Sequence, residues 1–285
     1  MIRKDNPFSN KHSLKIGDKI IDFSTPKIMG VINATPDSFF DGGTSNSVQK
    51  AIDKAINMVS EGAEFLDVGG YSSRPGADDV NAQEEIERTV PIVRAIHERF
   101  PDVFISIDTF RKQVAEKNLE VGATWVNDIS AGKLDPEMIF WIKKNKIPYI
   151  AMHMRGTPQS MQSECKYTNL INQVIDELVS AVQDLGPHHP LILDPGFGFS
   201  KTVNQNYELM NSLESFSKLN HPFLIGLSRK SMIQKVLNSS AKESLNGTTV
   251  LNTIGLLKGA SVLRVHDVKE AREVVLLIEK LRNIS

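Results

Sequence analysis

The stretch from Ile28 to Gly43, IMGVINATPDSFFDGG, combines a buried strand with a polar loop. Its first six residues are mostly apolar and partly β-branched, which is typical of a strand buried on both faces of a parallel sheet. The residues after Asn33 include Pro36, Asp37 and Asp41 and form turns readily. Taken alone, Asn-x-Thr-Pro-Asp would indicate only a turn. A buried strand that ends in Asn beside two carboxylates also fits the rim of an active site.

The same pattern repeats along the chain: a short apolar strand ends in a polar residue and is followed by a segment with helical periodicity. Eight such units are present. We predict strands over 28–33, 65–69, 104–108, 124–128, 149–153, 191–194, 223–228 and 262–266. In the first unit we expect Ser47 to cap the helix. Eight units with right-handed crossovers predict a (β/α)8 TIM barrel, an α/β fold with its chemistry at the carboxyl ends of the strands.

A doubly wound parallel sheet is the alternative architecture, but no Gly-x-Gly-x-x-Gly motif follows the first strand. The 285 residues fit one barrel domain over 27–285 with an N-terminal extension over 1–26. Within the extension, residues 13–24 alternate apolar and polar side chains around Gly17-Asp18, which predicts a hairpin. This hairpin either covers the bottom of the barrel or lies elsewhere on the surface.

Composition limits the possible partners. Hydrophobic residues make up 40% and charged residues 24%, so the chain can bury a large core. The net charge is −1 with both signs interspersed, which gives no field for nucleic acid or an anionic membrane. No stretch approaches the roughly 18 apolar residues of a membrane span. The single cysteine, Cys165, excludes an internal disulfide and suits a reducing compartment, so we expect a cytoplasmic protein.

The ends of the predicted strands carry an unusually polar set of side chains. It comprises Asn33, Asp67, Ser72 to Arg74, Asp108, Asn127, Asp128, His153, Arg155, Asp194, Ser228 to Lys230, Arg264 and His266. For Asp67 and Asp128 the alternative is that they only cap the following helix. Together, the carboxylates, amides and lysine can hydrogen-bond a flat nitrogen-rich ring, and the basic groups can hold phosphate.

Two later segments add to this picture. In Leu191 to Lys201, LILDPGFGFSK, a strand ends at Asp194 and a Pro-Gly turn bends over the predicted barrel mouth. Phe197 and Phe199 can flank a planar substrate. Ser228 to Ser231, SRKS, places basic groups before a helix N-terminus, which is a ready anion site.

Seven segments occur in the order and rough spacing of the dihydropteroate synthase family. They are INATPDSFFDGG, DVGGYSSRPGA, SIDTFR, VNDISAG, LDPGFGFSK, LIGLSRKSMI and LRVHDV, and the resemblance extends from about Lys27 to the C-terminus. It implies an enzyme that joins (7,8-dihydropterin-6-yl)methyl diphosphate to 4-aminobenzoate, with release of diphosphate, during folate synthesis. It also implies a homodimer.

The resemblance assigns roles position by position. Asn33 matches the family's Mg²⁺ ligand, which shares the ion with diphosphate oxygens. Residues that match pterin-binding positions are Asp108, Asn127, Asp194 and Lys230, and those that match the diphosphate end are Ser73, Arg264 and His266. The two loops and the 4-aminobenzoate pocket correspond to Phe39, Asp41, Arg74, Pro75, Phe199 and Ser231.

One position departs from the family pattern. The second loop commonly reads Gly-Glu-Ser-Thr-Arg-Pro-Gly, whereas here Tyr71 replaces the Glu and Ser73 replaces the Thr. Serine keeps the hydroxyl, while tyrosine removes a carboxylate and any charge role for that position.

Two other functions remain open at this level. A barrel methyltransferase acting on methyltetrahydrofolate would share the pterin-binding carboxylates and Asn but has no need for a diphosphate site. A pterin-binding protein without catalysis would keep the ring site and lose the loops, yet Asn33, Asp41, Arg74 and Pro75 are all retained.

Overall fold

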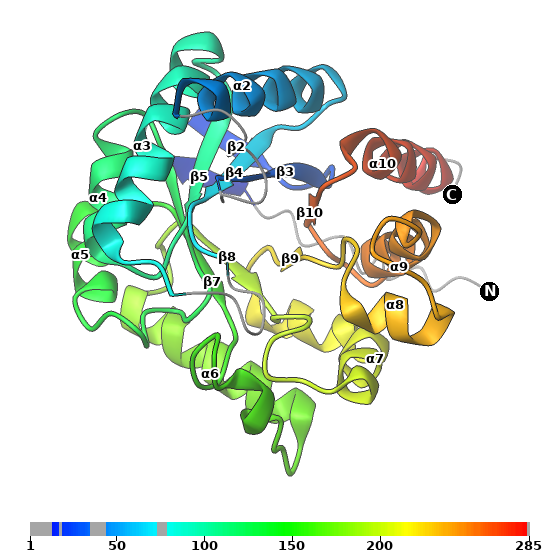
Figure 1. Ribbon diagram of the computed structural model, residues 1–285. Helices are drawn as coiled ribbons and strands as arrows, with labels where there is room; N and C mark the ends of the chain where they lie inside the picture. The colour runs from blue at the N-terminus through cyan, green and yellow to red at the C-terminus, as the bar shows by residue number, and fades with distance from the viewer. Residues whose placement is uncertain (1–12, 17–18, 35–43, 73–78, 284–285) are drawn as a thin grey trace.

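Eight parallel strands form the centre of the computed structural model, which describes residues 13–16, 19–34, 44–72 and 79–283. The strands are β3 (Lys27–Asn33), β4 (Phe65–Gly69), β5 (Phe104–Asp108), β6 (Trp125–Asp128), β7 (Tyr149–Met152), β8 (Leu191–Asp194), β9 (Leu224–Ile225) and β10 (Val262–Val265). Their order in the sheet is β8-β7-β6-β5-β4-β3-β10-β9. A bridge between Leu193 and Phe223 joins the two ends, so the sheet closes into a barrel (Figure 1). The predicted (β/α)8 fold is therefore confirmed.

Helices surround the barrel on its outside (Figure 1). They are α2 (Thr44–Ser60), α3 (Ala82–Arg99), α4 (Lys112–Leu119), α5 (Met138–Asn145), α6 (Leu170–Leu185), α7 (Val203–Asn211), α8 (Ser231–Leu237), α9 (Leu245–Leu257) and α10 (Val268–Arg282), with 3-10 turns η1 (Met161–Glu164) and η2 (Leu213–Leu219). Among the described helices, none has the length and apolar character needed to cross a membrane.

The alternation of side chains along each strand separates two buried layers. Outward-facing residues such as Ile28, Leu66 and Ile107 pack under the helices. Inward-facing residues fill the lower barrel in a second cluster, which contains Met29, Phe65, Trp125, Ile150, Ile192, Leu224 and Val262. Two residues further along several of these strands, the inward-facing positions become polar. The barrel thus has an apolar floor below a polar mouth.

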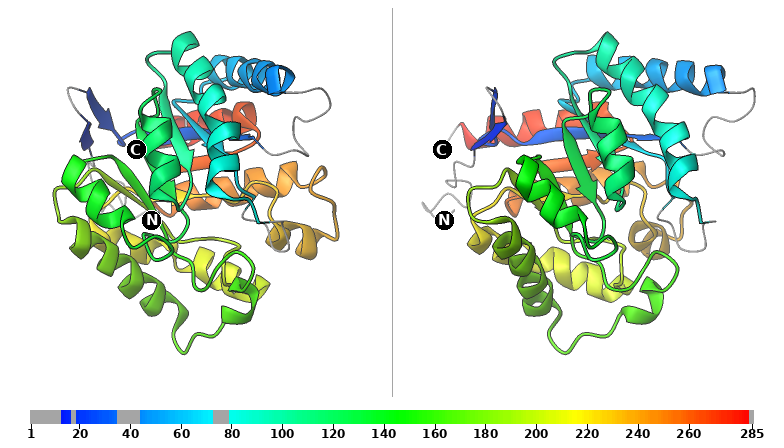
Figure 2. Two further views of the ribbon diagram at one scale, coloured as in Figure 1. Left: turned by 60° about the vertical axis from the view of Figure 1, so that its left-hand side comes forward. Right: turned by 90° about the vertical axis from the view of Figure 1, so that its left-hand side faces the viewer.

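The hairpin of β1 (Ser13–Ile16) and β2 (Lys19–Asp22) lies at the amino ends of the barrel strands, as Figure 2 shows. Ile21 and, just after β2, Phe23 are buried in the same cluster as the apolar floor. Of the two sequence-based alternatives, the one in which the hairpin covers the barrel bottom is therefore confirmed.

Two local predictions were wrong by more than one residue. Helix α2 begins at Thr44, so Ser47 lies inside the helix and does not cap it. Several residues of the sequence TSNS are good N-cap types, and the sequence alone does not choose among them. Strand β9 has two residues rather than six. It ends early because the chain turns after Ile225: the Lys230 N–H bonds the Leu227 carbonyl, and Arg229 has a φ of 57°.

Candidate active site

Strand alternation places a ring of polar side chains above the apolar floor. Asp67 follows Phe65, Asn127 follows Trp125, and Asp194 follows Ile192, each two residues further along its strand. By the same alternation Arg264 follows Val262, and Asn33 and Asp108 occupy the last positions of β3 and β5. The carboxyl ends of six strands thus contribute to one site, as the sequence predicted.

Arg264 connects the acidic groups of this site. Its Nε donates to an Asp67 oxygen at 2.6 Å, and a terminal nitrogen donates to Asp108 at 2.6 Å. The same Asp67 oxygen accepts from the Asn127 amide at 3.1 Å. Asp67 is fully buried, and its other oxygen has no partner among the described residues. Arg264 therefore joins two carboxylates of the barrel mouth.

The protonation of Asp108 follows from burial. Burial raises its pKa to about 7, although the Arg264 guanidinium lowers it, and the nearby charge of Asp67 raises it further. Without Arg264 the carboxyl would become still harder to ionise. Asp108 and Arg264 therefore form one coupled charge pair across the barrel mouth.

Asp194 lies on the neighbouring side of the mouth at the end of β8. Only 6% of the residue is exposed, and one carboxylate oxygen accepts the Gly196 N–H at 2.8 Å. Burial raises its pKa, while the charges of Lys230 and Arg264 oppose the rise. A buried carboxylate with its second oxygen available suits a bidentate pair of N–H donors on a heterocycle.

Lys230 is close to the loop after β8. Its ammonium donates to the Phe197 carbonyl and lies 4.7 Å from the centre of the Phe199 ring. Burial lowers the pKa of Lys230 to about 8, and Asp194 opposes this change. Lysine, aromatic ring and carboxylate are thus neighbours in a partly apolar corner, as a planar polar ligand requires.

Two groups on the predicted anion side, His266 and Arg229, have side-chain partners. His266 Nδ1 lies 2.9 Å from the Ser228 hydroxyl, and burial together with Lys54 lowers the pKa of His266 to about 4, so it is neutral at pH 7. Arg229 instead makes two bonds to Asp267, at 3.0 and 2.6 Å. The anion site expected from SRKS is thus narrower than the sequence indicated, because Arg229 already has a partner.

Comparison with known proteins identifies the family. Residues 29–266 match the family described as pterin binding enzyme. The Escherichia coli (strain K12) dihydropteroate synthase is 41% identical over 263 residues, 91% of this chain and 93% of that protein. The chain belongs to the pterin-binding enzyme family. Its activity is that of a dihydropteroate synthase, a transferase of folate biosynthesis that joins the pterin-methyl diphosphate to 4-aminobenzoate.

Solved structures of this family agree in fold. The Yersinia pestis dihydropteroate synthase in a sulfonamide drug complex has a TM-score of 0.88 and 36% identity, covering 95% of this chain and 100% of that one. The Xanthomonas albilineans dihydropteroate synthase in complex with 7,8-dihydropteroate has a TM-score of 0.84 and 28% identity, covering 95% and 99%. Both the methyltransferase and the non-catalytic alternative are set aside by these relatives.

Several family-matched residues lie outside the described part of the chain. They are Phe39, Asp41, Ser73, Arg74 and Pro75. Of the predicted aminobenzoate pocket, two residues are described. Phe199 packs beside Met152, Met154 and Met161 at the barrel mouth, and Ser231 is the first residue of α8. These two positions remain predictions of the family resemblance, with a location now given by the fold.

The departure at Tyr71 has a clear set of contacts. The Tyr71 hydroxyl accepts from the Gln159 amide at 2.7 Å, and its ring meets Phe110 edge-on at a centroid distance of 5.3 Å. The Arg111 guanidinium lies 5.2 Å from the Tyr71 ring and also bonds Glu85 at 2.6 Å. Where the family resemblance leads us to expect a carboxylate, this chain therefore has an aromatic ring in contact with Phe110 and Arg111.

Asn33 is a suitable but incomplete metal ligand. It is half-buried at the end of β3, and within the described residues its side-chain amide makes no hydrogen bond. The described residues also contain no group of three or more His, Cys, Asp or Glu arranged for a metal. One neutral oxygen fits an ion such as Mg²⁺ that keeps water and substrate phosphate as its other ligands.

Three residues of the polar set have structural partners instead. Asp128 accepts from the Tyr149 hydroxyl at 2.6 Å and from the Ser130 and Gly132 N–H groups, which belong to the turn after β6. Because α5 begins only at Met138, Asp128 holds this turn and does not cap a helix. His153 and Arg155 both lie next to Glu177 of α6. The sequence did not single out Lys201, which is buried beside His153. A lysine after a Gly-rich turn looks like a surface residue until the fold is known.

Proposed function

We propose that the polar mouth of this barrel binds the pterin ring through Asp108, Asn127, Asp194 and Lys230. The observation that carries this assignment is the buried Asp194 carboxylate, which has one oxygen bonded to Gly196 and lies close to the Lys230 charge. Asp194 accepts ring N–H groups, and Lys230 donates to a ring acceptor once it leaves the Phe197 carbonyl. In this proposal the side chains of the site complement the donors and acceptors of a pterin.

The diphosphate end of the substrate lies, in this proposal, at Ser73, Arg264 and His266. Arg264 uses Nε and one terminal nitrogen for Asp67 and Asp108, which leaves N–H groups for an anion. His266 is neutral, so it contributes a ring N–H rather than a full charge. Developing charge on the leaving group is then met by fixed donors that need no reorganisation.

The reaction is a substitution at the pterin methylene carbon. The carbon–oxygen bond to diphosphate breaks, diphosphate leaves with the electron pair, and the aminobenzoate nitrogen forms the new bond and loses a proton. Asp108 and Asp194 stabilise the positive charge that the ring shares at the transition state. An arylamine is neutral at pH 7, so no strong general base is required.

A magnesium ion completes the proposed site, with Asn33 as the described residue that would hold it. When bound, Mg²⁺ neutralises charge on diphosphate. The family-matched loop residues Phe39, Asp41, Arg74 and Pro75 form the remaining walls for aminobenzoate, together with Phe199 and Ser231. Sulfonamides resemble aminobenzoate in shape, and the Yersinia pestis relative is described with such a drug. We expect them to compete for this second pocket.

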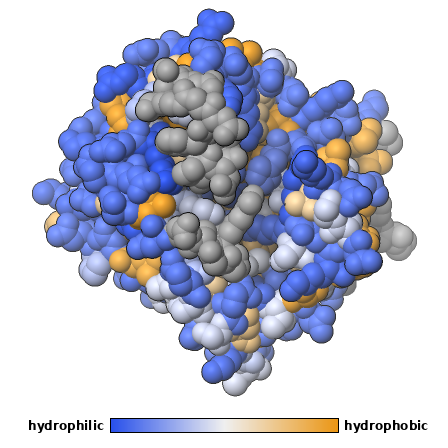
Figure 3. Space-filling model, in the orientation of Figure 1, coloured by the Kyte–Doolittle hydropathy of each residue, from blue (hydrophilic) through white to orange (hydrophobic). Residues whose placement is uncertain are grey.

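We also propose a homodimer, formed through the face of α8, α9 and α10. Each of these helices has large apolar side chains that are about half exposed or more. They are Val236, Leu237, Val250, Leu257, Leu276, Leu277 and Leu281. Apolar surface is visible along this edge of the molecule in Figure 3. A second copy of the chain would remove this surface from water.

For the location we propose the cytoplasm, because Cys165 has no other cysteine to pair with.

The test of the proposed roles is turnover by the purified protein. Mixing the pterin-methyl diphosphate, 4-aminobenzoate and Mg²⁺ should release diphosphate and form dihydropteroate in equal amounts. The same mixture without aminobenzoate should release little diphosphate. Turnover that persists when Asp194 is changed to Asn, with unchanged affinity for the pterin substrate, would contradict the assigned ring site.

A further inference from the structure

A buried lysine lies behind the loop that follows β8. Only 3% of Lys201 is exposed. Its ammonium nitrogen lies 2.9 Å from His153 Nδ1, 3.0 Å from the Gly196 carbonyl and 3.1 Å from the Phe199 carbonyl. An ammonium has three N–H groups, and here each has one acceptor. The charged form of Lys201 is thus fully satisfied without water.

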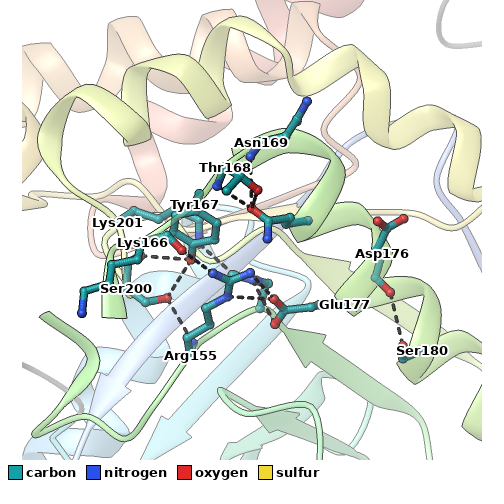
Figure 4. A network of polar contacts seen from close by, with 12 residues as sticks. Arg155, Lys166, Tyr167, Thr168, Asn169, Asp176, Glu177, Ser180, Ser200 and Lys201 are labelled. Carbon is teal, nitrogen blue, oxygen red and sulfur yellow. Dashed lines mark hydrogen bonds and ion pairs between the residues drawn. The ribbon is translucent and has the colours of Figure 1, made fainter. Parts of the chain in front are cut away.

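The lysine also fixes the state of His153. Because His153 Nδ1 accepts from Lys201, its proton lies on Nε2, which faces a Glu177 oxygen at 3.4 Å. Burial and the Lys201 charge lower the pKa of His153 to about 4, so the ring is neutral. Glu177 in turn bonds Arg155 at 2.8 Å and Lys133 at 2.8 Å, and Figure 4 shows Arg155 and Glu177 facing each other. Glu177 thus lies between the surface groups and His153, although among the described residues Nε2 of His153 forms no hydrogen bond.

The loop after β8 connects two groups of the proposed site and has a tightly packed backbone. Asp194 precedes it, and Phe199 lies within it. At Gly196, where φ is 72°, an added Cβ would lie 2.0 Å from the His153 carbonyl, so loop and strand end are in direct contact. Lys230 donates to the Phe197 carbonyl, and Lys201 donates to the carbonyls of Gly196 and Phe199.

Burial and the neighbouring carboxylates act in opposite directions on the pKa of Lys201. Burial lowers its pKa to about 7, Asp194 and Glu177 raise it, and Lys230 and Arg155 lower it. A neutral amine has two N–H groups, so loss of the proton would leave one of the three acceptors unpaired. The ammonium, rather than the neutral amine, thus matches the three acceptors around it.

We propose that Lys201 is a positioning residue: held by His153, its ammonium fixes the loop that directs Asp194 and Phe199 toward the two substrates. This inference rests on the proposed binding roles of Asp194 and Phe199. Lys201 touches neither substrate and acts only through the backbone carbonyls that it holds.

The first test is Lys201→Met, which keeps the length of the side chain and removes all three donors. We expect the KM for the pterin-methyl diphosphate to rise about tenfold or more, with a smaller fall in kcat, because the loop directs Asp194 for ring binding first and for charge stabilisation in the chemical step second. Lys258→Met is the matched control, since Lys258 also holds a backbone carbonyl, that of Asn211 at 3.0 Å, but far from the site in the chain. Its KM should stay within about twofold of the wild-type value.

A second pair of variants tests the acceptor and remains informative if Lys201→Met fails to fold. His153→Asn places an amide oxygen near the position of Nδ1, whereas His153→Leu removes the acceptor with a side chain of comparable bulk. We expect the Asn variant to stay within about threefold of the wild-type KM and the Leu variant to resemble Lys201→Met.

Three outcomes would overturn the inference: a wild-type KM in folded Lys201→Met, equal losses in His153→Asn and His153→Leu, or a loss confined to kcat. Asp194→Asn separates this failure from failure of the proposed site. If Asp194→Asn weakens pterin binding and Lys201→Met does not, the ring site stands and the positioning role is wrong. If neither changes pterin binding, the proposed ring site itself is wrong.

Discussion

A terminal guanidinium nitrogen of Arg264 in β10 lies 2.6 Å from a carboxylate oxygen of Asp108 in β5. The Nε of the same arginine bonds the fully buried Asp67 at 2.6 Å. Burial works against the charge of Arg264, but the two carboxylates outweigh it and raise its pKa. One arginine thus makes two acidic groups tolerable in the barrel mouth.

Arg264→Met should therefore destabilise the fold by about 3 to 5 kcal/mol, because it leaves buried carboxylates without their cation. The loss should depend on pH. Without Arg264 the pKa of Asp108 rises above its present value of about 7, and well above that of an unfolded Asp near 4. The folded variant then binds more protons than the unfolded chain between these limits, so its stability falls as pH rises.

Urea unfolding at pH 5.5 and pH 8 measures this effect. The free energy of unfolding of Arg264→Met, relative to wild type, should be lower at pH 8 than at pH 5.5. Arg229→Met is the control, because it removes a partly exposed ion pair with Asp267 and should cost about 1 kcal/mol or less. Equal losses for the two variants would show that Arg264 is not needed to balance the acidic groups.

The contacts of Arg264 could not be predicted from the sequence, whereas several strand ends could. The predicted ends of β4, β5 and β8 agree with the structure, because each is an apolar run followed at once by turn-forming residues. The partners of Arg264 are 156 and 197 residues away in the chain, and strand periodicity says only that all three side chains face inward.

Lys201 shows a second limit of the same kind. Burial of a lysine requires acceptors, and these are one histidine nitrogen and two backbone carbonyls whose direction only the folded loop defines. The position of the polar set could be predicted, whereas its pairing could not. Asp67 and Asp128 illustrate this, since both are buried acids at strand ends, yet one joins the site and the other bonds Tyr149.

Asp194→Asn should weaken binding of the pterin substrate by about 2 to 4 kcal/mol. The change turns a charged acceptor into an amide that presents N–H to ring N–H donors. Aminobenzoate should be affected less. Calorimetry with the pterin substrate measures the loss, and Asp176→Asn on α6 is the control. If Asp194→Asn binds the pterin with wild-type affinity, the ring lies elsewhere.

Mg²⁺ and diphosphate should bind interdependently through Asn33, because one amide oxygen is too weak a ligand to hold the ion alone. Calorimetric titration of Mg²⁺ with and without diphosphate should show tighter binding when diphosphate is present. Asn33→Ala should remove this coupling, and Asn57→Ala on the exposed side of α2 should keep it. Equal Mg²⁺ affinity in both titrations would argue against the ligand role of Asn33.

Leu277→Glu should convert the proposed dimer to a monomer. Leu277 is 68% exposed on α10, and a carboxylate there would have to be buried without a partner at the interface. Sedimentation velocity measures the change. Phe140→Glu on α5 is a matched control, because Phe140 is 70% exposed on another side of the barrel. A wild-type chain that sediments as a monomer would exclude the dimer directly.

Sulfonamides should bind after the pterin site is filled. The residues that we assign to the pterin lie at strand ends or beside the buried loop after β8, and the strand ends are held by the sheet. The second pocket depends in addition on Phe39, Asp41, Arg74 and Pro75, which the sequence places between the predicted strands. With Phe199 and Ser231 alone, the pocket has too few walls, so Mg²⁺ and diphosphate should be needed to assemble it.

Calorimetry of one sulfonamide against the free protein and against its Mg²⁺-diphosphate complex tests this order. We expect binding only to the complex, competition with 4-aminobenzoate, and loss of both in Arg74→Ala. Tight binding to the free protein would disprove assembly by diphosphate. If neither form binds the drug while turnover is intact, the second pocket must differ from that of sulfonamide-binding relatives. The variants Tyr71→Glu and Ser73→Thr would then restore the common residues of the second loop.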